Sequence, residues 1–162
     1  MNYEQALEYI HSITWRGSRP GLSRTQELLE KIGNPEKSFK AVHIVGTNGK
    51  GSTSAFIESV LRKAGYKTGL YTSPYIWRFN ERIRFCGDEI SDSDLAEVTE
   101  FVKPFAEEMI DPPTEFELIT AIGFEYFTII QSIFHLGLFF VIFISDDYSK
   151  SITIILLPLR YC

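Results

Sequence analysis

The residues with the clearest chemical potential lie between Gly46 and Thr53, in the sequence Gly-Thr-Asn-Gly-Lys-Gly-Ser-Thr. Glycines allow the backbone to curl so that several N–H groups point at one anion. Lys50 adds a positive charge, and Ser52 or Thr53 adds a hydroxyl that could reach a phosphate or Mg²⁺. The strict pattern G-x-x-x-x-G-K-[ST] is not met, because Gly51 follows Lys50. The segment nevertheless predicts a phosphate-binding loop rather than a glycine turn with one lysine, which we expect at the surface of the loop.

The loop is predicted to join a strand to a helix, the context that phosphate binding needs. An apolar run over 41–45 predicts the strand, and helical spacing from Ser52 to Ala64 predicts the helix. The apolar positions expected on the buried side of this helix are Phe56, Ile57, Val60, Leu61 and Ala64. Residues 68–72 predict a second strand, parallel to the first in a βαβ unit. Ser73 therefore follows the carboxyl end of that strand, at the sheet edge where ligands bind.

Further elements are predicted on both sides of this unit. Periodicity predicts helices over 3–13 and 22–32, separated by a loop over 15–20. A small hairpin is expected around Gly87-Asp88, joining 83–85 to a partner near Ile90. Ser91 with Asp94 should cap the next helix, which Pro104 should kink or split. Thr114 with Glu117 is a capping box for a last helix through about Phe127.

Composition limits the class of protein. The chain has 162 residues, 44% of them hydrophobic, which suits one domain with a core. The net charge of -5 argues against a broad nucleic-acid surface. Cys86 and Cys162 show neither metal spacing nor a disulfide framework, and the N-terminus has no secretory pattern. These features predict a cytoplasmic protein with no nucleic-acid partner.

Five segments, in this order, resemble the bacterial folylpolyglutamate synthase family, a Mur-ligase type of ATP-dependent amide ligase. Some members of this family also act as dihydrofolate synthase. The segments are Tyr9-Ile10-His11-Ser12, Gly46-Thr47-Asn48-Gly49-Lys50-Gly51-Ser52, Gly69-Leu70-Tyr71-Thr72-Ser73-Pro74-Tyr75, Arg78-Phe79-Asn80-Glu81-Arg82-Ile83, and Thr114-Glu115-Phe116-Glu117 with Thr120-Ala121. The family loop reads G-T-N-G-K-G-[ST], which accounts for the departure from the strict pattern. The resemblance covers roughly residues 1–127. It implies an α/β fold: a P-loop-containing parallel sheet with flanking helices, as an incomplete Mur-ligase-type ATP-binding domain.

The resemblance also implies a reaction and its participants. The family joins L-glutamate to the γ-carboxyl of a folate through an acyl phosphate, with ATP and Mg²⁺. Dihydropteroate is a further substrate in some members, and a monomer is expected. Site roles follow by position. Asn48, Gly49, Lys50, Gly51 and Ser52 would hold the triphosphate, with Lys50 as the catalytic residue. Ser73 and Ser52 would bind Mg²⁺, Arg78 and Arg82 would meet substrate carboxylates, and Thr114, Phe116 and Glu117 would contact the pterin side.

Structural alternatives remain for these residues. Ser52 could be a helix N-cap, Ser73 a turn serine before proline, and Thr114 with Glu117 a plain capping box. Two other functions also remain open. One is a different P-loop nucleotide-hydrolysing enzyme, which would need an acidic Mg²⁺ ligand at a strand end; Asp146-Asp147 is the nearest match. The other is a catalytically inactive nucleotide-binding fragment.

The segment 128–162 differs in amino-acid composition from the residues before it. Residues 129–144 are nearly all apolar, interrupted by Gln131, Ser132 and His135. A membrane span needs roughly 20 apolar residues, so no membrane association is expected, and a buried strand with turns is one interpretation. The family pattern would continue after Phe127 with Glu-Val-Gly-Leu-Gly-Gly, which is missing here. We therefore expect 1–127 to be a partial ATP-binding domain and 128–162 to be an apolar tail from a frameshift or truncation.

Overall fold

The computed structural model describes residues 1–13, 20–44, 46, 48–134 and 139–143. The chain divides into two compact units. One comprises Met1–Ser38 with Ser91–Ile129, and the other comprises Phe39–Ile90 with the described residues from Ile130 onward. Helices make up the regular structure described in the first unit, whereas the second contains a sheet and one long helix.

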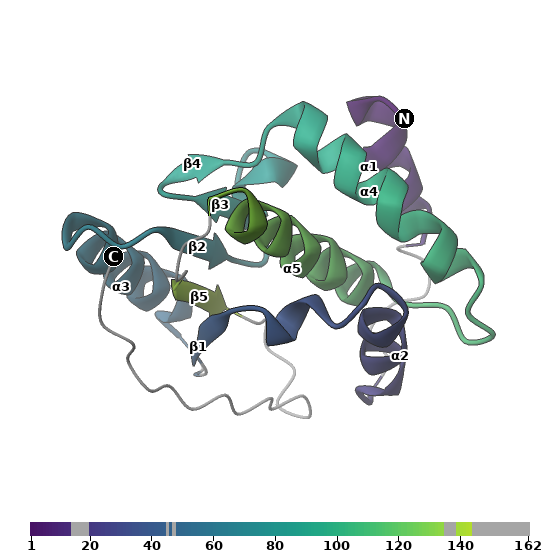
Figure 1. The fold of residues 1–162 in the computed structure, drawn as a ribbon, viewed down its shortest axis with the longest axis horizontal. Coiled ribbons are helices and arrows are strands. Elements are labelled where there is room, and N and C mark those ends of the chain that lie inside the picture. The colour runs from purple at the N-terminus through teal and green to yellow at the C-terminus, as the bar shows by residue number, and fades with distance from the viewer. Residues whose placement is uncertain (14–19, 45, 47, 135–138, 144–162) are drawn as a thin grey trace. The chain divides into compact units, whose positions relative to one another are not determined.

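The sheet has five strands in the order β1-β5-β2-β3-β4 (Figure 1). Their bounds are β1 Lys40–Ile44, β5 Phe139–Phe143, β2 Thr68–Tyr71, β3 Ile83–Phe85 and β4 Asp88–Glu89. β1 and β2 each pair in parallel with β5, so the predicted parallel pair and the α/β class are confirmed. β1 and β2 are not neighbours, however, because β5 lies between them. β3 and β4 extend the sheet in antiparallel fashion.

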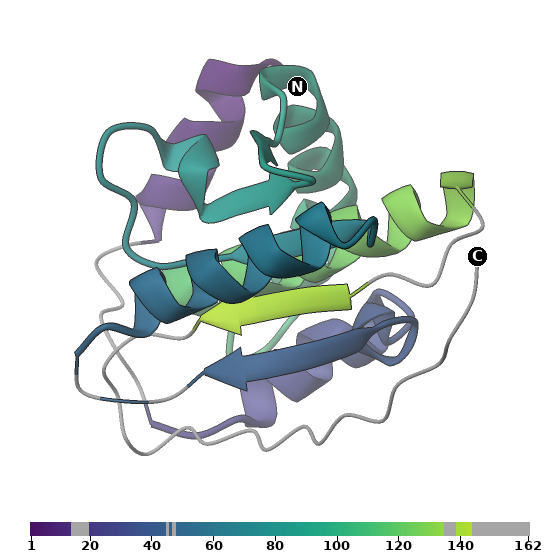
Figure 2. The same cartoon turned by 90° about the vertical axis from the view of Figure 1, so that its left-hand side faces the viewer.

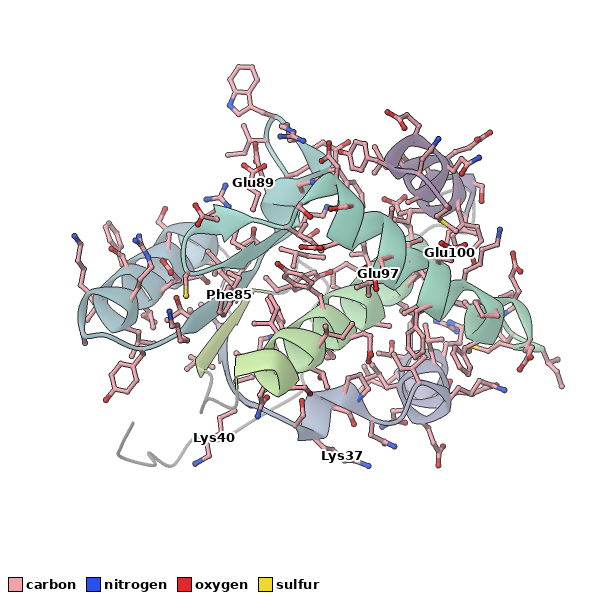
Figure 3. All side chains as sticks on the ribbon, turned by 45° about the horizontal axis from the view of Figure 1, so that its top comes forward. Lys37, Lys40, Phe85, Glu89, Glu97 and Glu100 are labelled. Atoms are coloured by element: carbon pink, nitrogen blue, oxygen red, sulfur yellow. The ribbon has the colours of Figure 1, made fainter. Side chains whose placement is uncertain are left out.

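The predicted hairpin is formed by β3 and β4. Phe85 and Glu89 lie on its two strands (Figure 3), and Cys86 and Gly87 form the turn with φ of 52° and 94°. Two consecutive positive φ values are typical of a two-residue type I′ turn, which suits the twist of a hairpin. A Cβ at Gly87 would lie 3.1 Å from Cζ of Arg62, so a larger residue would require a small shift of the end of this side chain.

Helix α3 (Lys50–Lys63) packs against β5 and β2 and more lightly against β1 (Figure 2). Its buried residues are Lys50, Ser54 and Glu58. The predicted buried side is wrong in part, because Phe56 is 73% exposed and Val60 is 68% exposed; Ala64 is exposed as well. Hydrophobic spacing misidentified the face because polar residues with hydrogen-bond partners can be buried at little cost.

The hydrogen-bond partners of Ser54 and Glu58 belong to the same unit as α3. The Ser54 hydroxyl donates to the carbonyl of Lys50 at 3.0 Å. Oε1 of Glu58 accepts hydrogen bonds from Nε of Arg62 at 3.0 Å and from the hydroxyl of Thr68 at 2.6 Å. Glu58 therefore links α3 to the start of β2.

The first unit contains α1 (Tyr3–Ser12), α2 (Ser23–Lys31), the short 3₁₀ helix η2 (Pro35–Lys37), α4 (Asp92–Glu107) and most of α5 (Glu115–Phe134). α1 packs along α4 (Figure 1), and the amino group of Met1 pairs with Glu100, which lies on α4 with Glu97 (Figure 3). The largest fully buried apolar side chains of this unit are Ile10, Leu28, Leu95, Leu118, Ile119, Ile122 and Phe127. The predicted helices over 3–13 and 22–32 are confirmed with slightly shorter bounds.

Two helices differ from expectation. α4 continues through Pro104 instead of splitting, and the N–H of Glu108 still donates to the carbonyl of Pro104 at 3.1 Å. The predicted N-cap is present, since Ser91 accepts from the N–H of Asp94 at 3.0 Å. α5 extends to Phe134 rather than ending near Phe127. Its apolar sequence has no glycine or proline between Glu125 and Phe134 to end the helix.

The apolar segment from Thr128 onward thus forms the end of α5 and strand β5 where it is described. The assignment of 128–162 to a frameshift or truncation stays a prediction, as does the boundary at Phe127. The predicted loop over 15–20, except Pro20, and the pair Asp146-Asp147 lie outside the described residues. Within the described part of the chain, none of the helices has the length and apolar character needed to cross a membrane.

Candidate functional site

The glycine-rich loop leads directly into the first turn of α3. Gly49 precedes the helix with φ 73° and ψ 1°, a left-handed conformation that favours glycine. Among the described residues no side chain caps this helix end, and Gly51, Ser52 and Thr53 are exposed. The first N–H groups of a helix lack intrahelical partners and carry the positive end of its dipole. An exposed, uncapped first turn behind glycines can therefore bind an anion.

Lys50 begins α3 and is only 7% exposed. The expectation that it lies at the surface of the loop is wrong. A Cβ at Gly46 would lie 3.7 Å from Cγ of Lys50, so the aliphatic part of the lysine passes close to that glycine. Lysine commonly buries its methylene chain in this way while its ammonium group faces a polar partner.

Ser73 shares a sheet edge with this loop. β1, β5 and β2 are parallel, so their carboxyl ends lie at one edge, and the loop follows β1 while Ser73 follows β2. Figure 2 shows β1 and β5 pointing the same way, with α3 beginning at that end. Ser73 is 6% exposed, whereas Ser52 is exposed. The predicted nucleotide and metal residues of this unit are thus placed at the same edge of the sheet.

Acidic metal ligands are not gathered here. Among the described residues, no group of three or more His, Cys, Asp or Glu side chains could hold a metal ion. The candidate donors are therefore the hydroxyls of Ser52 and Ser73. Two hydroxyls are a weak donor set by themselves, so a Mg²⁺ ion held here would have to keep several waters and take its other ligands from nucleotide phosphates.

The loop after Ser73 is organised by Glu81, which the sequence analysis did not single out. Its carboxylate accepts hydrogen bonds from three successive backbone N–H groups, those of Ile76 at 2.9 Å, Trp77 at 3.1 Å and Arg78 at 3.1 Å. These bonds, that of Ile76 foremost, lower the pKa of Glu81. The side chains of Ile76 and Trp77 are 81% and 86% exposed. The sequence signal that could have identified this role is the spacing, because a glutamate three residues after Arg78 can bond back to the N–H of that residue.

Arg82 and Arg78, both predicted to meet substrate carboxylates, have different environments. Arg82 is 9% exposed, and its Cζ lies 5.2 Å from the ring centroid of Tyr75 and 5.1 Å from that of Phe79. Its Nε has no hydrogen-bond partner among the described residues. Arg78 is more exposed and approaches Glu89 at 3.9 Å. Arg82 thus presents a buried guanidinium close to two aromatic rings, an arrangement in which a carboxylate would be a favourable partner.

The remaining predicted residues lie in the first unit, at the start of α5. The capping box is confirmed: the N–H of Thr114 donates to Oε2 of Glu117 at 2.8 Å, and the N–H of Glu117 donates to the hydroxyl of Thr114 at 3.3 Å. Arg24 of α2, which the sequence analysis did not identify, donates to both oxygens of Glu117. Burial alone would raise the pKa of Glu117, but the bonds from Arg24 and Thr114 outweigh it and lower that pKa. Phe116 is half-buried.

Comparisons with known proteins agree with this geometry. No family model matches the chain. It is 46% identical over 129 residues to a dihydrofolate synthase/folylpolyglutamate synthase from Bacillus subtilis, covering 77% of this chain and 30% of that protein. The crystal structure of a folylpolyglutamate synthase from Thermotoga maritima matches with a TM-score of 0.75 and 35% identity, covering 86% of this chain and 32% of that one. An FPGS–AMPPCP–folate complex matches with a TM-score of 0.74 and 34% identity, covering 88% and 35%.

The three parallel strands of the sheet, the glycine-rich junction before α3 and the matched structures identify an α/β, P-loop-containing domain of the Mur-ligase type, present in part. The chain is homologous to the N-terminal part of folylpolyglutamate synthases. It spans about a third of the length of the relatives it matches.

Proposed function

We propose that this chain is the N-terminal part of an ATP-dependent ligase that adds L-glutamate to the γ-carboxyl of a folate. The observation that carries the proposal is the glycine-rich loop, which ends at the uncapped, exposed first turn of α3 with Lys50 as its first residue. Homology to folylpolyglutamate synthases supports the reaction, and one matched structure is a complex with the ATP analogue AMPPCP and folate.

The reaction has two steps. A carboxylate is a poor electrophile, so an oxygen of the folate γ-carboxylate first attacks the γ-phosphorus of ATP, giving an acyl phosphate and ADP. The amine of glutamate then attacks the acyl carbon, loses a proton and displaces phosphate, forming the amide. Phosphoryl transfer of this kind depends mainly on positioning and on neutralising the phosphate charge.

The second unit would hold the triphosphate. Backbone N–H groups of Gly49, Gly51 and Ser52, with Asn48, would surround the phosphates at the start of α3. Lys50, anchored by its buried methylene chain, would stabilise negative charge on the β- and γ-phosphate oxygens. Ser52 and Ser73 would be the protein ligands of Mg²⁺, which neutralises phosphate charge when bound.

The substrate residues lie in both units. Arg82 carries a buried guanidinium whose Nε has no partner among the described residues, and it would bind a carboxylate of folate or glutamate. Arg78 is an exposed cation on the same loop. In the first unit, Thr114, Phe116 and Glu117 would be the residues on the pterin side of folate or dihydropteroate. The proposed ligase would act on these small molecules as a monomer in the cytoplasm.

Equilibrium binding of AMPPCP with and without Mg²⁺ tests the nucleotide site. Lys50→Met should weaken binding at least about tenfold, since one charge-assisted contact to phosphate contributes about 1.5–3 kcal/mol. Lys63→Met is the matched control, because Lys63 is an exposed lysine in the last turn of the same helix. Equal effects of the two substitutions, or no binding by the wild-type chain, would contradict the proposed nucleotide site.

Turnover distinguishes the three functions. The ligase proposal requires that ADP release by the chain depend on both a folate or dihydropteroate and glutamate. ATP hydrolysis with neither added would instead favour another P-loop nucleotide-hydrolysing enzyme. Nucleotide binding without turnover under any of these conditions would favour the inactive nucleotide-binding fragment.

A further inference from the structure

We propose that Arg24, Glu117 and Thr114 form a positioning cluster that fixes the first turn of α5, and that Glu117 acts through this cluster without touching a ligand. The inference rests on the proposed function, since it concerns the pterin side of that site. It changes the role expected for Glu117 from substrate contact to positioning residue, and it adds Arg24, which no motif identified.

Both carboxylate oxygens of Glu117 accept hydrogen bonds within the cluster. Oε2 accepts from Nε of Arg24 at 3.0 Å, from the N–H of Thr114 at 2.8 Å and from the hydroxyl of Thr114 at 3.0 Å. Oε1 accepts from Nη2 of Arg24 at 3.0 Å. The residue is 2% exposed. Because the carboxylate is this deeply buried, a ligand donor could reach it only if the groups around it moved, at the expense of these hydrogen bonds.

Arg24 ties three segments together. It is 6% exposed, projects from α2 and uses two donors on Glu117 in a fork-to-fork arrangement. A further donor, Nη1, reaches Oδ2 of Asp111 at 3.4 Å, in the segment before α5. A planar guanidinium fits a carboxylate in this bidentate way, whereas a lysine ammonium would supply the charge without the fixed geometry.

The cluster determines what the start of α5 can offer a ligand. Thr114 is 2% exposed, its hydroxyl is bonded to Glu117, and its carbonyl accepts from the N–H of Leu118 at 2.9 Å. Phe116 lies between Thr114 and Glu117 in the sequence and is half-buried, so part of this residue is accessible. Of the three predicted pterin residues, Phe116 is therefore the one available for contact, and the cluster holds the turn that carries it.

Native-state amide exchange of the full chain, resolved by NMR, tests the positioning role. Arg24→Met should speed exchange of the Thr114 and Glu117 amides at least about tenfold, because the freed carboxylate no longer fixes the turn, while amides of α3 stay unchanged. Arg24→Lys should restore part of the protection. Lys103→Met is the control, since Lys103 forms an ion pair with Glu107 at 3.7 Å in the same unit with both side chains partly exposed. Unchanged amide exchange at Thr114 in a folded Arg24→Met variant would overturn the proposal. If Arg24→Met does not fold, Glu117→Gln is used in its place, and unchanged exchange at Thr114 in that variant would likewise overturn the proposal.

Binding of folate and of dihydropteroate to the same variants tests whether Glu117 touches the ligand. The proposal requires Arg24→Met and Glu117→Gln to lose affinity in parallel with lost amide protection, and the double variant to be no weaker than Arg24→Met alone. A loss of affinity in Glu117→Gln with Thr114 protection intact would show direct contact and overturn the proposal. If the wild-type chain binds neither ligand, the substrate part of the proposed function fails, and amide exchange still decides the positioning role by itself.

Discussion

Two buried threonines allow the same substitution to be tested with and without a hydrogen-bond partner. Thr68 and Thr99 are both 0% exposed. The Thr68 hydroxyl donates to Glu58 at 2.6 Å, whereas the Thr99 hydroxyl has no hydrogen-bond partner among the described residues. Valine replaces the hydroxyl with a methyl group of similar size, so the partner is the main difference between Thr68→Val and Thr99→Val.

The two substitutions should change the free energy of unfolding by different amounts and in different directions. A hydrogen bond to a charged group contributes about 1.5–3 kcal/mol, and Thr68→Val should lower the free energy of unfolding by about that amount. The Glu58 carboxylate would keep its bond from Arg62, so it is not left without a partner. An unsatisfied buried hydroxyl costs about 1–3 kcal/mol, so Thr99→Val should be neutral or stabilising by up to about 1 kcal/mol. Threonine and valine have similar helix propensities, so the change of propensity in α4 should contribute little to the free energy of unfolding of Thr99→Val.

Urea unfolding provides the measurement. Circular dichroism and tryptophan fluorescence curves must coincide before a single free energy is extracted, because the chain forms two compact units. Combining Thr68→Val with Glu58→Gln should cost less than the sum of the two changes, since both act on the same bond. Equal destabilisation by Thr68→Val and Thr99→Val would refute the reasoning that the partner, not burial, decides the cost.

Three further outcomes are expected. Acid should loosen the start of α5 and the loop held by Glu81, because the pKa values of Glu117 and Glu81 are lowered in the folded chain. The stabilisation from each carboxylate is complete above the pKa of an unfolded glutamate, about 4.3, and is lost as the pH falls through the lowered pKa of the folded state. Amide exchange at Thr114 and Ile76 against pH checks this, and Glu117→Gln should remove the pH dependence at Thr114. Gly49→Ala should destabilise by about 1–2 kcal/mol through strain at φ 73°, although no described atom lies within 4 Å of the added Cβ, and should weaken AMPPCP binding. Phe56→Ser should change the unfolding free energy by less than about 0.5 kcal/mol because Phe56 is 73% exposed; a loss above 2 kcal/mol would contradict its exposure.

The local features of this chain could be predicted from its sequence. The caps at Ser91 and Thr114 depend on residues three positions apart, and the loop before α3 on contiguous glycines. Such signals are short-range, so they are visible without knowledge of the fold. The parallel arrangement followed from the strand–helix–strand order, but the insertion of β5 between β1 and β2 did not, because chain order does not fix sheet order.

The features that escaped prediction are long-range or involve buried polar groups. Arg24 and Glu117 are 93 residues apart, so no spacing rule connects them. Lys50, Ser54 and Glu58 turn the polar side of α3 inward while Phe56 stays exposed, contrary to hydrophobic periodicity. Glu58 has a partner that only the folded chain supplies, the hydroxyl of Thr68.

Glu81 and Glu117 show why a capping motif alone does not reveal a residue's role. Each carboxylate binds the N–H of a residue three positions earlier, Arg78 and Thr114 respectively. Glu81 binds two more backbone N–H groups and shapes an exposed loop, whereas Glu117 binds a buried arginine from another helix. Removing Glu81 should therefore release a loop with little loss of global stability. Removing Glu117 takes the bidentate partner away from a buried guanidinium, which keeps its contact with Asp111 at 3.4 Å, and should cost up to about 3–5 kcal/mol. Glutamine at each position, compared by urea unfolding, separates the two roles: similar losses would mean that the burial of Arg24 does not determine the cost.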